Sequence, residues 1–322
     1  MRVLSVIVGL LIFGTVAPAQ DAEPAPATPS RPKVKLLEPG AEPRQALRYE
    51  PRIGQSERAV IEMRISSSVS MGGAEMPAQE MPPTKMTILQ TPAAVNEAGD
   101  YVINIVIEDF TATGEGPMVA MMRQSMQPLV GATAAGEVSP RGESLRFEMQ
   151  EIDAAGPMRA QMESMGSQAS QLGAVFPEEP VGVGARWEVT MELDNAGVMM
   201  QQTMLATLKS IEGDVITLDM AMSQSAEQQD FAPPGMPPGM EVDLESLTGS
   251  GEGVMQIDLS RLVPVRSTLD ATTKIVMAVM MQGQQQEMAQ SMKMAMSITG
   301  ALASEEPAPE PEAEPAEAGG GG

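Results

Sequence analysis

Residues 59–71 read AVIEMRISSSVSM, and apolar and polar side chains alternate along this stretch. Ile61, Met63, Ile65, Val69 and Met71 fall on one face of an extended chain. The charged and hydroxyl residues between them fall on the other face. Successive side chains of a strand point to opposite faces of a sheet, so this stretch predicts an antiparallel strand that is buried on one side only.

The same alternation recurs along most of the chain. Residues 97–100 (EAGD), 140–143 (PRGE) and 212–214 (EGD) separate alternating segments, and short connections rich in glycine and acidic residues predict hairpins. We therefore predict a mainly β fold, with a large curved antiparallel sheet or open half-barrel of about eleven strands. The predicted strands cover residues 58–72, 83–95, 101–113, 130–138, 144–151, 185–193, 198–211, 214–225, 251–260, 264–279 and 287–300.

Two segments between the strands have helical spacing instead. Pro117 begins the first and Pro157 begins the second, and proline favours the first turn of a helix. Each segment carries a stripe rich in methionine, so we expect two short helices that lie over the concave face of the sheet. The stripes consist of Met118, Met121, Met122 and Met126 in the first helix and Met158, Met162, Met165, Ala169 and Leu172 in the second.

The start of the chain has the features of a secretory signal peptide. Arg2 is followed by an apolar stretch at residues 3–16 and by the small residues Ala17-Pro18-Ala19, so residues 1–19 are the predicted signal peptide, with cleavage after Ala19. The apolar stretch is shorter than the roughly 20 residues of a membrane-spanning helix. No cysteine follows it, which excludes a lipoprotein anchor. We expect a periplasmic or secreted protein.

Composition predicts the boundaries of the domain. Residues 20–45 are rich in proline and alanine, and residues 303–322 consist mainly of proline, glutamate, alanine and glycine. Such segments bury too little apolar surface to offset the entropy of ordering, so a disordered linker and a disordered acidic tail are expected. Residues 46–302 between them are predicted to form a single β-rich domain, with possible halves at 46–175 and 176–302.

Missing residue types exclude several function classes. The chain has no histidine and no cysteine, so Ser-His-Asp and Cys-His catalysis are impossible, as are thiolate and imidazole metal sites. The formal net charge of −23 argues against a nucleic-acid partner, because such partners are bound by clustered lysine and arginine. We therefore expect no enzymatic activity, no cofactor and no nucleic-acid binding.

The 30 methionines suggest what the interior does. Methionine is flexible and fills irregular space, which suits a cavity for a lipid-like or other apolar ligand. A packed core that uses methionine in place of other apolar residues fits the same pattern. If the cavity exists, its predicted lining is Met121, Met122, Met162 and Met165 from the helices, with Ile105, Met220, Met277 and Met294 from the strands.

Two other functions stay open at this point. One is a structural or interaction protein of the cell envelope, with a dry core and a protein partner of unknown identity. The other is a Cu(I)-binding protein, because thioether sulfur is a soft ligand; its best site would be Met236 and Met240 in a proline-rich loop.

Short landmarks lie between about residues 45 and 300: Leu47-Arg48-Tyr49, Gly54, Phe176-Pro177, Pro180-Val181, Gly184, Trp187, Gly251, Gly253 and Asp258. They resemble a family of uncharacterised exported bacterial proteins that is common in planctomycete-like genomes. The order of strands and inserted helices is also similar to the half-barrel of envelope lipoprotein carriers and receptors, which implies an enclosed acyl chain but transfers no binding residue. We expect Trp187 to anchor the core.

Overall fold

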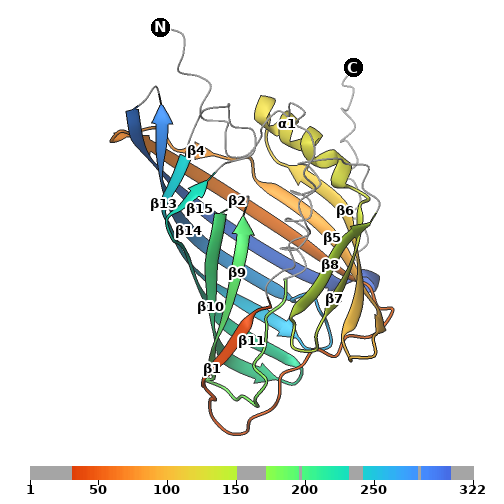
Figure 1. Cartoon of the computed structure of the whole chain (residues 1–322). Helices are drawn as coiled ribbons and strands as arrows, with labels where there is room; N and C mark the ends of the chain where they lie inside the picture. The colour runs from red at the N-terminus through yellow and green to blue at the C-terminus, as the bar shows by residue number, and fades with distance from the viewer. Residues whose placement is uncertain (1–30, 151–171, 196–197, 232–241, 282–283, 306–322) are drawn as a thin grey trace, which may run out of the picture.

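The computed structural model describes residues 31–150, 172–195, 198–231, 242–281 and 284–305. Nearly all of the regular structure in these residues belongs to one large, open, antiparallel sheet that curves strongly (Figure 1). The mainly β prediction is confirmed. The predictions for residues 1–30 and 306–322, which include the signal peptide and most of the acidic tail, concern residues outside the described ranges.

The sheet contains fifteen strands in the described part of the chain. They are β1 (Lys33–Glu38), β2 (Glu57–Met71), β3 (Ala74–Glu75), β4 (Gln79–Glu80), β5 (Thr84–Val95), β6 (Tyr101–Ala112), β7 (Thr133–Val138), β8 (Ser144–Gln150), β9 (Arg186–Asn195), β10 (Val198–Glu212), β11 (Val215–Ala226), β12 (Gln229–Phe231), β13 (Val242–Asp258), β14 (Arg266–Met281) and β15 (Gln284–Leu302). Within the described ranges, one α-helix, α1 (Pro117–Met126), and two short 3₁₀ turns, Gln127–Leu129 and Ala303–Glu305, accompany them.

The strand order places strands from the two halves of the sequence side by side. The path runs β1-β9-β10-β11-β13-β14-β15-β2-β5-β6-β7-β8, so β1 and β8 are its two ends. Most neighbours are consecutive in sequence, as the predicted hairpins require. Two pairings join strands that are distant in sequence: β1 with β9, and β2 with β15 over the whole length of β2, from Glu57↔Leu302 to Met71↔Met288. The ladder between β2 and β15 makes one continuous sheet out of the two predicted halves.

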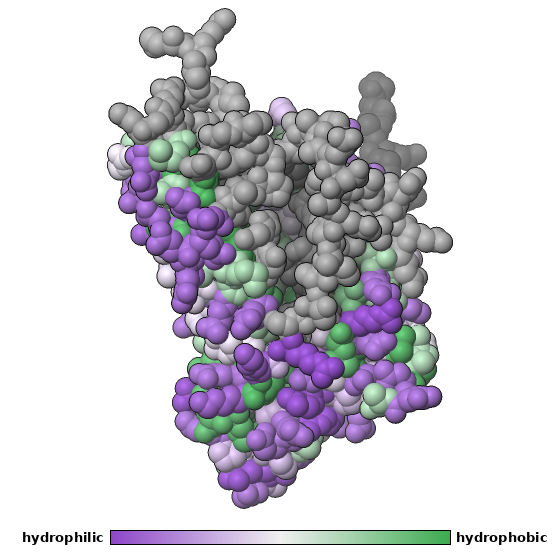
Figure 2. Space-filling view, in the orientation of Figure 1, coloured by the Kyte–Doolittle hydropathy of each residue, from purple (hydrophilic) through white to green (hydrophobic). Residues whose placement is uncertain are grey.

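The alternation of side chains gives the sheet an inner and an outer face. On the inner face, Ile61, Trp187, Leu218 and Ile298 are buried in the main core cluster. Connecting segments cover this face with Leu47, Tyr49, Phe176 and Val181, which are also buried. The outer face carries most of the charged side chains, and Figure 2 shows a mostly hydrophilic surface on the described residues of one side.

Three aromatic side chains tie the covering segments to the sheet. The ring centroids of Tyr49 and Phe176 are 5.0 Å apart, and those of Phe176 and Trp187 are 6.5 Å apart. The Trp187 indole Nε1–H donates to the Val175 carbonyl oxygen at 2.8 Å. Because Trp187 is fully buried, its predicted role as a core anchor is confirmed.

All eleven predicted strands are present, but four strands were missed. Residues 33–38, which the composition placed in a disordered linker, form β1 and pair with β9. Strand β13 begins at Val242, not at residue 251 as predicted, because a bulge between Leu244 and Ser246 breaks the alternation there. The strands β3, β4 and β12 have only two or three residues, too few to show a period.

One of the two predicted helices lies in the described residues. Helix α1 begins at Pro117 as expected, but its buried residues are Val119 and Met122, which pack against Ala112 of β6. Met118 and Met121 are 46% and 47% exposed, so of the predicted methionine stripe only Met122 is buried. Gly114 and Gly116, which precede α1, have positive φ. The conformation of this loop helps to determine which face of α1 turns toward the sheet, and sequence periodicity does not reveal that conformation. The second helix, predicted from Pro157, lies outside the described residues.

A buried carboxylate connects the first long strand to a distant turn. Glu57 begins β2 and is 2% exposed. Its Oε2 accepts hydrogen bonds from the backbone N–H of Leu262 at 3.0 Å and of Val263 at 2.8 Å, in the connection between β13 and β14. Burial raises the pKa of Glu57 to about 7, although these two N–H groups and the charge of Arg261 oppose the shift.

We expect Trp187→Ala to lower the free energy of unfolding by about 3–5 kcal/mol, because it removes a fully buried aromatic side chain. Val254→Ala, at an exposed position of the same sheet, is the control and is expected to change it by less than about 0.5 kcal/mol. Urea denaturation followed by circular dichroism measures both. Similar small effects in the two variants would show that Trp187 does not anchor the core.

The raised pKa of Glu57 predicts a pH dependence of stability. The folded protein favours the protonated form, so the stabilisation from Glu57 is present below about pH 4.5 and is lost as the pH rises through about 7. Between about pH 5 and pH 8, the wild type should lose about 2–3 kcal/mol more than Glu57→Gln, whose amide does not titrate. Urea titrations at both pH values test this. Equal losses in the two proteins would contradict a raised pKa.

Candidate functional site

The structure distributes the predicted ligand-binding residues over several clusters. Ile105 is buried in the main core, and Met220 packs against the same core. Met277 belongs to a second cluster with Leu244 and Val279, and Met122 belongs to the small cluster under α1. Met294 packs on a fourth cluster. Met121 is exposed, and Met162, Met165 and the alternative copper ligands Met236 and Met240 lie outside the described residues.

Met294 belongs to a row of side chains that crosses six strands on the inner face. We call it the methionine row. The register places its members side by side: Met204, Met222, Gly251, Ala271, Met294 and Ile65, from β10, β11, β13, β14, β15 and β2. Met222 and Ala271 are buried, whereas Met204, Met294 and Ile65 remain partly exposed although they share the face of the core.

A row with polar residues lies next to the methionine row. It contains Gln202, Gln224, Gly249, Thr273, Met292 and Ser67, again paired strand by strand. The Gln224 Nε2–H donates to Gln202 Oε1 at 2.7 Å. The row after it contains Leu247, Ile275, Gln290 and Val69. Mainly apolar rows on the inner face are therefore separated by a row that carries uncharged amide and hydroxyl side chains.

The sequence of β13 explains why the methionine row and the polar row have no side chain on this strand. Gly249, Gly251 and Gly253 occupy three successive inner-face positions, so no side chain rises from β13 in these rows. A Cβ at Gly253 would collide with the carbonyl oxygen of Thr268 on β14, and a Cβ at Gly251 would lie 2.9 Å from that of Asp270. The glycines let the two backbones approach closely, as strands do where a sheet bends sharply.

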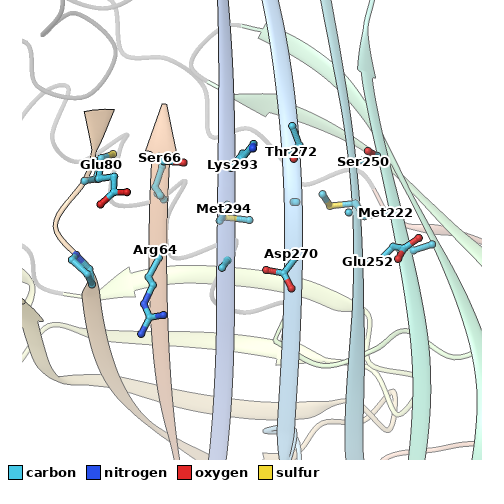
Figure 3. Close-up of a pocket in the computed structure, with 17 residues that line it drawn as sticks. Arg64, Ser66, Glu80, Met222, Ser250, Glu252, Asp270, Thr272, Lys293 and Met294 are labelled. Atoms are coloured by element: carbon cyan, nitrogen blue, oxygen red, sulfur yellow. The ribbon is translucent and has the colours of Figure 1, made fainter. Parts of the chain in front are cut away.

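A shallow groove crosses the outer face over the same strands. Its volume is about 750 Å³. One row of side chains contains Arg64, Asp270 and Glu252, and the other contains Ser66, Lys293, Thr272 and Ser250 (Figure 3). Alternation along the strands places both rows on the outer face. The strand positions of Met294 and Met222, which belong to the methionine row, lie between these two rows. Glu80 of β4 completes the groove at one end.

The groove carries side chains of both charges, as surfaces that contact another molecule often do. Glu252 lies directly opposite Asp270 in the register, and like charges so placed repel each other. In the described part of the chain, no three acidic residues come together in a way that would hold a metal ion. The structure thus offers an apolar inner face and a charged outer groove as candidate sites.

Of the ligand-binding residues predicted from the sequence, only Met294 belongs to these rows, and the other members were missed. The missing information was the register between strands that are distant in sequence, such as β2 and β15. A usable signal was present in residues 249–253, GSGEG, because alternate glycines within a strand mark a place where one face loses its side chains.

Comparison with known proteins adds a family match to this geometry. Residues 146–261 match a family of unknown function (DUF6263). The match supports the resemblance to an uncharacterised family and runs from β8 into the connection after β13. The planctomycete-like source and the similarity to envelope lipoprotein carriers stay predictions. No curated protein matches the chain.

Several solved structures are similar to the chain at low identity. OpdQ of Pseudomonas aeruginosa is 8% identical, with 77% of this chain and 98% of that chain covered and a TM-score of 0.20. OccK11 (OpdR) of the same organism is 7% identical, with 80% and 100% covered and a TM-score of 0.21. The toluene transporter TodX of Pseudomonas putida is 9% identical, with 76% and 89% covered and a TM-score of 0.14. TM-scores this low place no constraint on function.

Among the described residues, no helix is both long enough and apolar enough to cross a membrane.

The glycines of β13 give a testable difference. Gly253→Ala should lower the free energy of unfolding by about 1–3 kcal/mol, because the new Cβ pushes against the backbone of β14. Gly249→Ala is the matched control. The three atoms nearest to its Cβ would all belong to side chains, Gln224 Oε1 at 3.0 Å, Thr273 Oγ1 at 3.1 Å and Gln224 Cβ at 3.3 Å, so a loss below about 1 kcal/mol is expected. Equal losses in urea denaturation would contradict this account of the bend.

Proposed function

We propose that this protein is a non-enzymatic exported protein that binds a lipid-like or other apolar ligand on the inner face of its curved sheet. The observation that carries the proposal is the partial exposure of apolar side chains on that face. Met63, Ile65, Met292, Met294 and Met296 all share the face of the core, yet none of them is fully buried. A dry, completed core would bury side chains at these positions.

The chemistry of these side chains suits a ligand of variable shape. Methionine has three rotatable bonds and a polarizable sulfur, so a methionine surface repacks around different apolar shapes. Each square ångström of apolar surface that a ligand removes from water contributes roughly 25 cal/mol. Shape and burial, rather than charge, would therefore set affinity.

A pair of variants on neighbouring residues tests the proposal. Met294 lies on the inner face of β15 and Ala295, the next residue, lies exposed on the outer face. Met294→Glu should weaken binding of the apolar fluorophore N-phenyl-naphthylamine at least about tenfold, because a carboxylate is costly to desolvate. Ala295→Glu adds the same charge on the other face and should leave binding unchanged. Fluorescence titration measures both.

Met294→Gln guards against misfolding of the glutamate variant, because it adds a neutral polar group at the same site. It should weaken binding less than Met294→Glu does and leave the circular dichroism spectrum unchanged. Equal binding by the wild type, Met294→Glu and Ala295→Glu would remove the inner face from the site. Failure of the wild type to bind the fluorophore would contradict the function itself.

A second function is favoured by the outer groove. Its side chains of both charges, together with an open shape, suit an interaction protein that docks an envelope partner by complementary charge. Under this reading the inner face binds nothing, so the fluorophore experiment separates the two. Cu(I) binding at Met236 and Met240 remains a prediction on residues outside the described ranges.

A further inference from the structure

One polar atom on the inner face has no partner. The side-chain oxygen Oε1 of Gln290 is buried and accepts no hydrogen bond from the described part of the chain. Most buried polar atoms in proteins have a partner, and a single exception calls for a specific explanation. Gln290 lies on β15, two residues before Met292 and four before Met294, so it shares the face of the proposed ligand site.

The surroundings of Gln290 are apolar. Ile275 of β14 and Val69 of β2 are its neighbours across the sheet. Met288 and Met292 precede and follow it on the same face. None of these four side chains offers a hydrogen-bond donor, and the hydroxyls of Ser67 and Thr273 in the next row make no hydrogen bond to Oε1.

The inner face around Gln290 also carries no charge. In the stretches of β2, β14 and β15 around Gln290, the inner-face positions hold only apolar, hydroxyl or amide side chains: Met63, Ile65, Ser67, Val69 and Met71; Leu269, Ala271, Thr273, Ile275 and Met277; Met288, Gln290, Met292, Met294 and Met296. Arg64, Asp270 and Lys293 occupy alternate positions on the outer face, and the buried Glu57 lies at the far end of β2. A charged head group would therefore find no counter-ion in these stretches.

We propose that the amide of Gln290 is the polar contact of the ligand site and that the ligand is an uncharged amphiphile. Its apolar chain packs on the methionine row, and its hydroxyl group donates a hydrogen bond to Gln290 Oε1. A hydroxyl both donates and accepts, so it satisfies the side-chain amide in either orientation. The inference rests on the proposed function and adds the class of ligand to it.

This assignment separates alcohols from fatty acids. An ionised carboxylate cannot donate to Oε1, and its charge would be desolvated against apolar side chains without a cation. An alkane binds the apolar surface but leaves the amide oxygen unpaired. The site should thus prefer a long-chain alcohol to both an alkane and a carboxylate of equal length.

The experiment uses dodecanol, dodecane and dodecanoate as competitors of N-phenyl-naphthylamine on the folded protein. Dodecanol should bind at least about tenfold more tightly than dodecanoate. Gln290→Met, which keeps the side-chain volume, should weaken dodecanol about tenfold and leave dodecane unchanged. Ser291→Met, at the next residue on the outer face, is the control and should leave all three affinities unchanged.

Each outcome has a distinct meaning. If none of the competitors displaces the fluorophore from the wild type, the proposed apolar-ligand function fails. If dodecane and dodecanol compete and Gln290→Met changes neither, only the assignment of Gln290 fails. Tightest binding by dodecanoate would overturn the uncharged ligand.

A stability measurement gives a second, independent test. Removing an unpaired buried oxygen should raise the Tm of the ligand-free protein, so Gln290→Met should melt at a higher temperature than the wild type. A lower Tm would show that Gln290 is already hydrogen-bonded in the free protein and would overturn the inference.

Discussion

The pairing of β2 with β15 is the constraint on which the rest of the structure depends. It joins the first long strand to the last and fixes which residues of both face inward. Because the side-chain period of a strand is two, a slip of one residue would turn Arg64 and Lys293 toward the core and the methionines toward solvent. Glu57 supports this register at the start of β2, since its buried carboxylate accepts two backbone N–H groups from the turn between β13 and β14.

Once the register is set, charge and hydrophobicity separate cleanly between the two faces. The outer face holds a shallow groove with arginine, lysine and three acidic residues. Apart from the buried Glu57, the inner face of β2, β14 and β15 holds uncharged side chains, and one part of it is sealed by Tyr49, Phe176 and Trp187. Outside this seal Met63, Ile65, Met292, Met294 and Met296 are only partly buried, although Ala271 and Met277 of β14 are buried. The difference between the sealed and the open part of one face is what favours a ligand over a dry core.

Much of the fold could be predicted from local pattern, and the remainder could not for identifiable reasons. Alternation located all eleven long strands, and Pro117 located α1, because both signals lie within a few neighbouring residues. Strand β1 was missed since prolines surround it, and the start of β13 was hidden by a bulge. For the site, the abundance of methionine predicted an apolar inner surface. Gln290 was missed because its isolation depends on Val69 and Ile275, which only the long-range register brings beside it.

The central claim is that the inner face holds an apolar ligand. Native mass spectrometry of the chain from Gln20 onward, purified from a bacterial periplasm without detergent, tests this claim most directly. The account predicts a population whose mass exceeds that of the polypeptide by one uncharged lipid-sized molecule, released when the protein is unfolded. A bare polypeptide mass, unchanged after incubation with a lipid extract, would contradict it and leave the outer groove as the functional surface.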